Sequence, residues 1–171
     1  MLRLALLAFL FYFAIAPVTG ETAFTGIMDK YLESDWQNLG ATVIYNASKG
    51  EVAVRKDLNY PSRAGAILFI GQIDPSDDIE LRFNVLSLSG SYALLLHYGK
   101  PDKYDEQYIV LQEDAFCLGP RSYNLSEALR LHGFSKPQDV AIHIMIGDPE
   151  ALTQPPQLGL MRLEDFSIGS P

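Results

Sequence analysis

The chain has little that could cross-link it or bind a cofactor. Its 171 residues include one cysteine, Cys117, so no intrachain disulfide can form, and the apolar segment 115–118 around it predicts a buried side chain. The three histidines lack the spacing of a zinc motif, and no glycine pattern typical of nucleotide-binding or nucleophile-elbow loops occurs. These absences disfavour a catalytic zinc site, a nucleotide site and a serine-hydrolase elbow, and they leave the hydrophobic core to hold the fold.

Positive charge is also scarce. The sequence has 13 Lys and Arg against 21 Asp and Glu, a formal charge of −8, and no cluster of basic residues offsets it. An acidic chain of this kind repels phosphate backbones, so we expect no nucleic-acid partner. After residue 20 no apolar run reaches the roughly 20 residues that a membrane span requires, so we expect no span in the mature chain.

The longest apolar run lies at the N-terminus. It covers residues 4–16 after the positive charge of Arg3, and small residues stand at Ala14, Ala16 and Gly20. A charged start, a short apolar stretch and small residues near a cleavage position are typical of a secretory signal peptide. We therefore predict a cleaved signal peptide over residues 1–20, one domain over residues 21–171 and a secreted protein, extracellular or periplasmic.

From residue 40 onward, short apolar runs alternate with turn residues. Residues 79–85 carry apolar side chains at every odd position, and residues 140–146 carry Val or Ile at every even position. The segment Ser89-Gly90-Ser91 separates two such runs and predicts a tight hairpin. This succession of short strands and turns predicts an all-β fold, an antiparallel β-sandwich of jelly-roll type.

One short helix is expected within this fold. Asn124 can cap its start, Glu127 follows at the capping-box position, and Gly133 suits the position just past its end. Asn124 also begins an N-glycosylation sequon, as does Asn46 in a predicted turn.

Strand parity predicts a polar surface on one sheet. If the odd positions of residues 79–85 face the core, the even positions share the opposite face. The same rule puts His97 and His143 on an outer face, because apolar residues occupy the alternate positions of both strands. We predict that Arg82, His97 and His143 line one surface, with tyrosines beside them. The predicted ligand-binding residues are Glu80, Arg82, Asn84, Tyr92, His97, Tyr108 and His143.

This mixture of side chains suits sugar binding. The apolar faces of a sugar ring stack on flat aromatic side chains, while Arg, Asn, Glu and His pair with its hydroxyl groups. The same residues would also form the solvated side of a half-buried sheet, so this interpretation needs the geometry of the folded protein.

Both ends of the predicted domain carry a family resemblance. The segment YLESDW at residues 31–36, followed by Gly40, resembles the opening of galactose-binding-domain-like carbohydrate-binding modules. The segment LEDFSI at residues 163–168 resembles their final strand, and residues 79–85 are similar to their central strand. The resemblance spans most of residues 31–168, through short motifs. It implies a jelly-roll β-sandwich that binds carbohydrate in a lectin-like manner, without catalysis.

The resemblance also implies a structural calcium ion. The family commonly binds calcium through an N-terminal Glu and a last-strand Asp, which correspond here to Glu33 and Asp165. A hard cation needs several oxygen ligands, and such an ion would order both ends of the domain. The sequence departs from the family pattern at Leu32, usually Phe, and at Glu164, usually Asp. An ordinary edge-strand carboxylate is the alternative interpretation of Asp165.

Two other functions fit the same sequence. An extracellular adhesion or structural module would use the polar surface to contact a protein. A glycan-degrading enzyme of the concanavalin-like type would need two carboxylates that meet in space, which 21 acidic residues easily allow. The leading prediction is a secreted, non-catalytic domain that binds carbohydrate or a cell-surface glycan.

Overall fold

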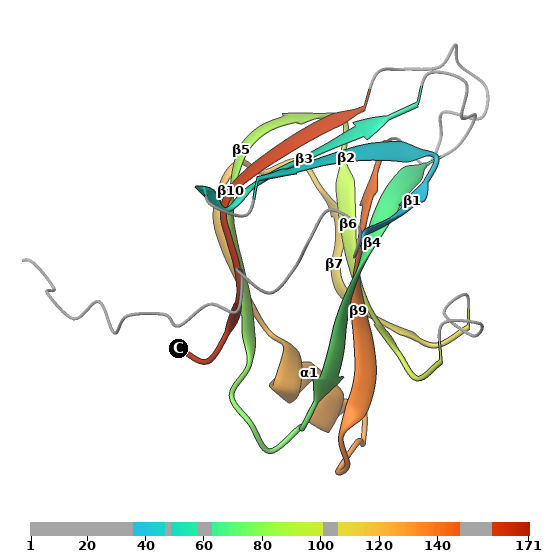
Figure 1. The fold of residues 1–171 in the computed structure, drawn as a ribbon, viewed down its shortest axis with the longest axis vertical. Helices are drawn as coiled ribbons and strands as arrows, with labels where there is room; N and C mark the ends of the chain where they lie inside the picture. The colour runs from blue at the N-terminus through green and yellow to red at the C-terminus, as the bar shows by residue number, and fades with distance from the viewer. Residues whose placement is uncertain (1–35, 47–48, 58–62, 101–105, 148–158) are drawn as a thin grey trace, which may run out of the picture.

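The computed structural model describes residues 36–46, 49–57, 63–100, 106–147 and 159–171, which form two antiparallel five-stranded sheets. Sheet I has the order β1 (Trp36–Leu39), β4 (Ala64–Ile73), β9 (Gln138–Ile146), β6 (Tyr92–Tyr98), β7 (Tyr108–Ala115). Sheet II has the order β2 (Ala41–Asn46), β3 (Glu51–Lys56), β10 (Leu160–Gly169), β5 (Glu80–Ser89), β8 (Gly119–Asn124). The two sheets face each other as layers, with the short helix α1 (Leu125–Leu131) at one end (Figure 1). The predicted β-sandwich with one short helix is confirmed.

The core lies between the two sheets, as strand alternation predicts. Leu81, Phe83 and Val85 of β5 are buried, and so are the even positions of β9 from Val140 to Ile146. Apolar side chains that alternate along both inner faces interdigitate in one cluster and lose their contact with water. This packing fixes which residues of each strand face outward.

The predicted hairpin at residues 89–91 is wrong. β5 pairs with β10 and β8 in sheet II, whereas β6 pairs with β9 and β7 in sheet I. The link therefore crosses from one sheet to the other. Ser91 Oγ donates a 3.0 Å hydrogen bond to the carbonyl of Gly147, the residue after β9. Two apolar strands joined by a short turn can form a hairpin within one sheet or cross between two sheets, because their sequence does not say which strands they pair with.

The helix begins and ends where the sequence predicts. Asn124 Oδ1 accepts a 2.7 Å hydrogen bond from the backbone N–H of Glu127, and its Nδ2 donates to Asp78 Oδ1 at 2.6 Å. Gly133 follows the helix with φ of 90°, a conformation that glycine adopts without strain. Among the described residues no helix has the length and apolar character needed to cross a membrane.

Cys117 is exposed, so the prediction of a buried side chain is wrong. It lies in the link between β7 and β8, where its neighbours Phe116 and Leu118 are also exposed, at 70% and 58%. Residues 116–118 are apolar, but they form the connection after β7 and are not part of a strand that packs in the core.

A β-bulge in β10 determines where the two adjacent carboxylates, Glu164 and Asp165, point. Leu163 pairs with Val85 and Ser167 with Arg82, so β10 has one more residue than β5 between these points. Asp165 is in the left-handed region, with φ of 51°, and the backbone N–H of Phe166 donates to the carbonyl of Gly50 at 3.1 Å. The extra residue lets Leu163 and Phe166 both face the core. Neither carboxylate points inward: Glu164 lies on the outer face and Asp165 is exposed.

The bulge predicts an asymmetric response at residue 165. Asp165→Val should lower the free energy of unfolding by about 1 to 2 kcal/mol, because a β-branched side chain is strained in the left-handed region. Asp165→Gly should be tolerated, since glycine adopts this conformation freely. Urea unfolding of both variants measures the difference. Equal destabilisation by Val and Gly would show that the carboxylate, and not the backbone conformation, matters there.

Candidate functional site

The structure divides the predicted site between two opposite faces of the sandwich. Glu80, Arg82 and Asn84 lie on β5 and point outward from sheet II, whereas His97 and His143 lie on the outer face of sheet I. The prediction that Arg82, His97 and His143 line one surface is therefore wrong. Parity correctly placed each residue outside the core, but β5 and β6 do not share a sheet.

Tyr92 cannot act as an aromatic platform. Its side chain is 0% exposed and packs in the core between the sheets. It has the same strand parity as Leu94 and Leu96, which also face the core. The alternation along β6 therefore contained the signal for this position. Tyr108, by contrast, is 43% exposed and lies beside His97 on the outer face of sheet I.

The outer face of sheet I contains an open hollow of about 500 Å³. His97, His143 and Tyr108 line it, and its other described walls come from all five strands of the sheet. Most of these walls are apolar, which is typical of ligand sites that use a few polar groups to orient a ligand. The apolar lining residues are Leu39, Ile67, Ala93, Leu95, Val110 and Met145.

The two histidines of this hollow form a buried, hydrogen-bonded pair. His97 is 4% exposed and His143 8%, and 3.1 Å separates His97 Nε2 from His143 Nδ1. Strand register produces the contact, because β6 and β9 are neighbours and the two residues sit diagonally across the pair. Burial, and then the nearby imidazole of His97, lower the pKa of His143 to about 4. His143 is therefore uncharged at neutral pH.

Gly65 of β4 provides the space for the His143 ring. A Cβ atom at this position would lie 2.6 Å from His143 Nε2 and 2.6 Å from the carbonyl oxygen of Ile144, which is closer than real Cβ contacts come. Any larger residue would have to push the ring away. The glycine thus sets the position of the imidazole from the neighbouring strand, and its role is not visible in the sequence.

Charged residues at one side of the hollow were not predicted from the sequence. Arg63, just before β4, forms an ion pair with Asp114 of β7, and Glu113 lies next to it. These residues are distant in sequence and no motif connects them, so only the pairing of the strands reveals the group. The described lining thus has one positive and two negative side chains, and Arg63 is neutralised by its partner.

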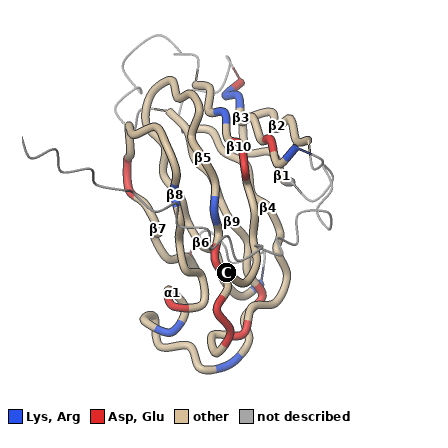
Figure 2. The backbone as a smooth tube through the Cα atoms, turned by 90° about the vertical axis from the view of Figure 1, so that its left-hand side faces the viewer, with Lys and Arg blue, Asp and Glu red and all other residues tan. Residues whose placement is uncertain are grey.

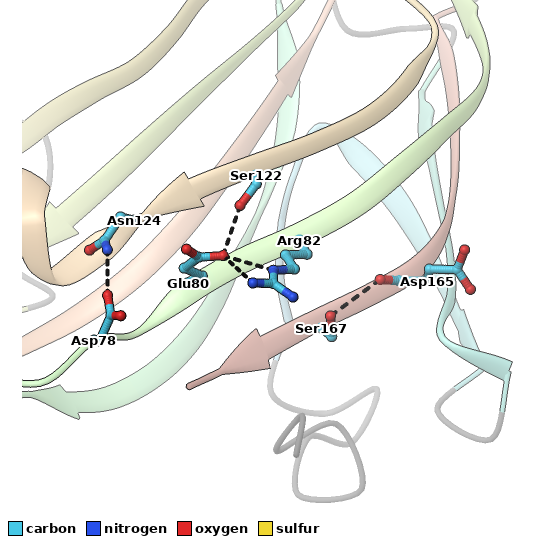
Figure 3. Close-up of polar contacts among 7 residues, drawn as sticks. All are labelled: Asp78, Glu80, Arg82, Ser122, Asn124, Asp165 and Ser167. Atoms are coloured by element: carbon cyan, nitrogen blue, oxygen red, sulfur yellow. Dashed lines mark hydrogen bonds and ion pairs between the residues drawn. The ribbon is translucent and has the colours of Figure 1, made fainter. Parts of the chain in front are cut away.

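The outer face of sheet II carries a polar network of its own. Glu80 Oε2 accepts hydrogen bonds from Arg82 Nε at 2.7 Å and from Ser122 Oγ at 3.0 Å (Figure 3). Asn84 Nδ2 donates to Glu164 Oε1 at 2.7 Å. Basic and acidic positions occur along neighbouring strands of sheet II (Figure 2). A second hollow of about 400 Å³ opens here, and its one described aromatic residue, Phe83, is 2% exposed.

The predicted calcium site is not complete within the described residues. Asp165 lies on β10 with its carboxylate directed away from the Glu80–Arg82 network (Figure 3), whereas Glu33 lies outside the described residues. The described part of the chain has no group of three or more His, Cys, Asp or Glu residues that could hold a metal ion. Calcium takes six to eight oxygen ligands, and of the two predicted ligands only Asp165 lies among the described residues. The calcium ion therefore stays a prediction.

Comparisons with known proteins give structural neighbours alone. The sequence matches no protein-family profile and no curated protein. A mutant of a family 29 carbohydrate-binding module is similar, with TM-score 0.48 and 14% identity over 86% of this chain and 88% of that chain. The family 86 xylan-binding module of Roseburia intestinalis has TM-score 0.46 and 11% identity, over 81% of this chain and 92% of that chain. A family 28 module specific for non-crystalline cellulose has TM-score 0.43 and 12% identity, over 88% and 96%. The expected likeness to carbohydrate-binding modules is found, and at these identities it concerns the fold alone.

Acid should destabilise the protein through His143. Its pKa of about 4 lies below the ordinary imidazole value of 6.5, so between these pH values the unfolded chain binds a proton that the folded chain does not. The free energy of unfolding therefore falls as the pH falls through this window, by about 2 to 3 kcal/mol at pH 4.5 from this group. Urea unfolding at pH 7 and pH 4.5 should show a smaller loss in His143→Gln. His132→Gln, which replaces an exposed histidine, is the control, and equal losses in all three proteins would contradict the assignment.

Gly65→Ala should disturb the histidine pair from the neighbouring strand. The added methyl group would displace the His143 ring and lower the free energy of unfolding by about 1 to 3 kcal/mol, the usual cost of overpacking. Thermal unfolding measures the cost, and imidazole ¹⁵N chemical shifts report on the contact between the rings. Unchanged shifts of His97 and His143 in a folded variant would show that the glycine does not position the ring.

Proposed function

We propose that the outer face of sheet I binds carbohydrate, with Tyr108 as the stacking surface and the His97–His143 pair as the hydrogen-bonding group. The observation that carries the proposal is the position of an exposed aromatic ring next to two buried imidazoles in one hollow. The ring centroids of His97 and Tyr108 are 6.0 Å apart, so one ligand can contact both. The volume of about 500 Å³ lies within the range of small-molecule sites and accommodates a short oligosaccharide.

The chemistry of this hollow suits a sugar. A pyranose presents C–H groups on its ring faces and hydroxyl groups at its edge, so it needs a flat apolar contact together with groups that donate and accept hydrogen bonds. Tyr108 and the apolar walls provide the first, while His97, His143 and the charged side chains of Arg63 and Asp114 provide the second.

Sheet I is a better candidate than sheet II. Several described polar groups on sheet II are engaged with one another: Glu80 accepts from Arg82 and Ser122, and Asn84 donates to Glu164. The described lining of its hollow offers no exposed aromatic surface for a sugar ring. Glu80, Arg82 and Asn84 are therefore not part of the proposed site, while His97, His143 and Tyr108 are.

We further propose that binding occurs without catalysis. A glycosidase holds two carboxyl groups on either side of the scissile bond. The described carboxylates of this hollow, Glu113 and Asp114, are consecutive residues of one strand, and Asp114 is paired with Arg63. Two carboxylates on one wall do not flank a bond. The signal peptide expected over residues 1–20 supports a secreted protein that meets its ligand outside the cell.

Truncation of Tyr108 should remove most of the affinity for carbohydrate. Tyr108→Ala loses the stacking contact, so the dissociation constant for the best ligand on a glycan array should rise about tenfold or more in isothermal titration calorimetry. Tyr108→Phe keeps the ring and should bind nearly as well as the wild type.

The matched control is Phe116→Ala, because Phe116 is an aromatic residue that is 70% exposed and does not line the hollow. Its affinity should equal that of the wild type. Wild-type protein that binds no glycan on the array would refute the proposed function, and products released from a polysaccharide panel would refute the absence of catalysis.

A further inference from the structure

Strand β7 forms one wall of the hollow on sheet I, and irregular pairing turns two of its consecutive carboxylates outward. Relative to β6, the strand has one extra residue between Val110 and Gln112 and another between Gln112 and Ala115. Each such bulge shifts the alternation of side chains along the strand. Glu113 and Asp114 are therefore both exposed, and both line the hollow although they are consecutive.

The side chain of Gln112 holds this irregular segment in place. Its Oε1 accepts a 3.3 Å hydrogen bond from the hydroxyl group of Tyr123 in β8, and its Nε2 donates to the carbonyl oxygen of Glu113 at 2.8 Å. One amide group thus connects the edge strand of sheet II to the backbone of Glu113. These two contacts fix the point from which the Glu113 side chain projects into the hollow.

The two carboxylates of this wall differ in what they contact. Asp114 forms an ion pair with Arg63, which neutralises it. Among the described residues, the carboxylate of Glu113 has no hydrogen-bond or ion-pair partner, because the contact with Gln112 uses its backbone oxygen. A carboxylate has two oxygens that accept charge-assisted hydrogen bonds, so it can bind two neighbouring hydroxyl groups of one sugar residue.

Tyr108 and Glu113 mark the two ends of the wall. Tyr108 pairs with His97, and Glu113 lies at the level of Ala93, so four residues of β6 separate the two positions, which is about 13 Å at the usual rise of a strand. Val110 lies between them, and its apolar side chain is 44% exposed. A single sugar ring is shorter than this distance. A ligand that stacks on Tyr108 and also reaches Glu113 must therefore contain several sugar residues.

We propose that Glu113 forms a second subsite of the hollow: it accepts hydrogen bonds from neighbouring hydroxyl groups of an uncharged sugar residue, while another residue of the same oligosaccharide stacks on Tyr108. This inference rests on the proposed function, since it names the ligand class of the same hollow. The ligand is then a neutral oligosaccharide that extends along β7. A uronic acid at the Glu113 end would bring two carboxylates together, and their repulsion disfavours it. Glu113 is thus a specificity-determining residue.

The test uses the sugar type that a glycan array identifies, as neutral oligosaccharides of increasing length and as a long oligosaccharide that contains uronic acids. Titration calorimetry at pH 7.5 and low salt, where charge effects are weakly screened, measures the wild type, Glu113→Gln and Glu51→Gln. Glu51 is an exposed carboxylate of β3 in sheet II that does not line the hollow on sheet I, so its variant removes the same charge elsewhere. In the wild type the affinity should rise about tenfold once the neutral ligand is long enough to reach Glu113, as expected for hydrogen bonds to a charged group.

Glu113→Gln should bind the long neutral oligosaccharide about tenfold more weakly than the wild type and the short one equally well. It should bind the acidic oligosaccharide more tightly than the wild type, because the repulsion is gone. These opposite signs separate a contact with the ligand from a role in folding, which would weaken both ligands together. Glu51→Gln should match the wild type with every ligand.

Two results overturn this inference and leave the proposed function standing, provided that Tyr108→Ala still loses affinity. One is an unchanged affinity of Glu113→Gln for the long neutral ligand, and the other is an equal loss for the neutral and acidic ligands. Absence of binding to every sugar by the wild type refutes the proposed function itself. Thermal unfolding of Glu113→Gln should match that of the wild type, because the replaced side chain is exposed.

Discussion

The packing of two apolar sheet faces against each other governs the arrangement of every other group in this protein. No disulfide supports the fold, so the buried even positions of β6 and β9 must stay in the core. Because the side chains of a strand alternate, the same constraint forces His97 and His143 outward. Because β6 and β9 are neighbours, it also places the two imidazoles side by side. The histidine pair is thus a consequence of core packing and strand order together.

The local sequence pattern predicts which side chains of a single strand face the core. It does not predict how two strands are placed relative to each other. The alternation along β5, β6 and β9 correctly separates core positions from outer ones, and the Asn124 cap fixes the start of α1. The same alternation does not tell which sheet a strand joins, so it wrongly predicts that Arg82 shares a surface with the histidines, which lie on the opposite face. Gly65 and the Arg63–Asp114 pair depend on contacts between β4, β9 and β7, and nothing in their own segments indicates them.

The bulge at Asp165 shows how a break in the pattern can carry structural information. Two adjacent carboxylates in an alternating strand first suggest a charged ligand site, because one of them should point inward. The left-handed conformation of Asp165 removes that conflict by adding one residue to the strand, and Phe166 recovers the core position. An aspartate tolerates this conformation better than most residues. The acidic pair therefore has a backbone explanation that does not require a ligand.

The strand order of sheet II has a further consequence for how the chain is made. β10 lies between β3 and β5, although it is synthesised after every other described strand. A nascent chain that lacks β10 leaves two unpaired strand edges facing each other, so sheet II cannot close during translation until this last strand has left the ribosome. Folding must then join segments that are far apart in sequence, which makes it slow and exposes the open edges to aggregation in the meantime.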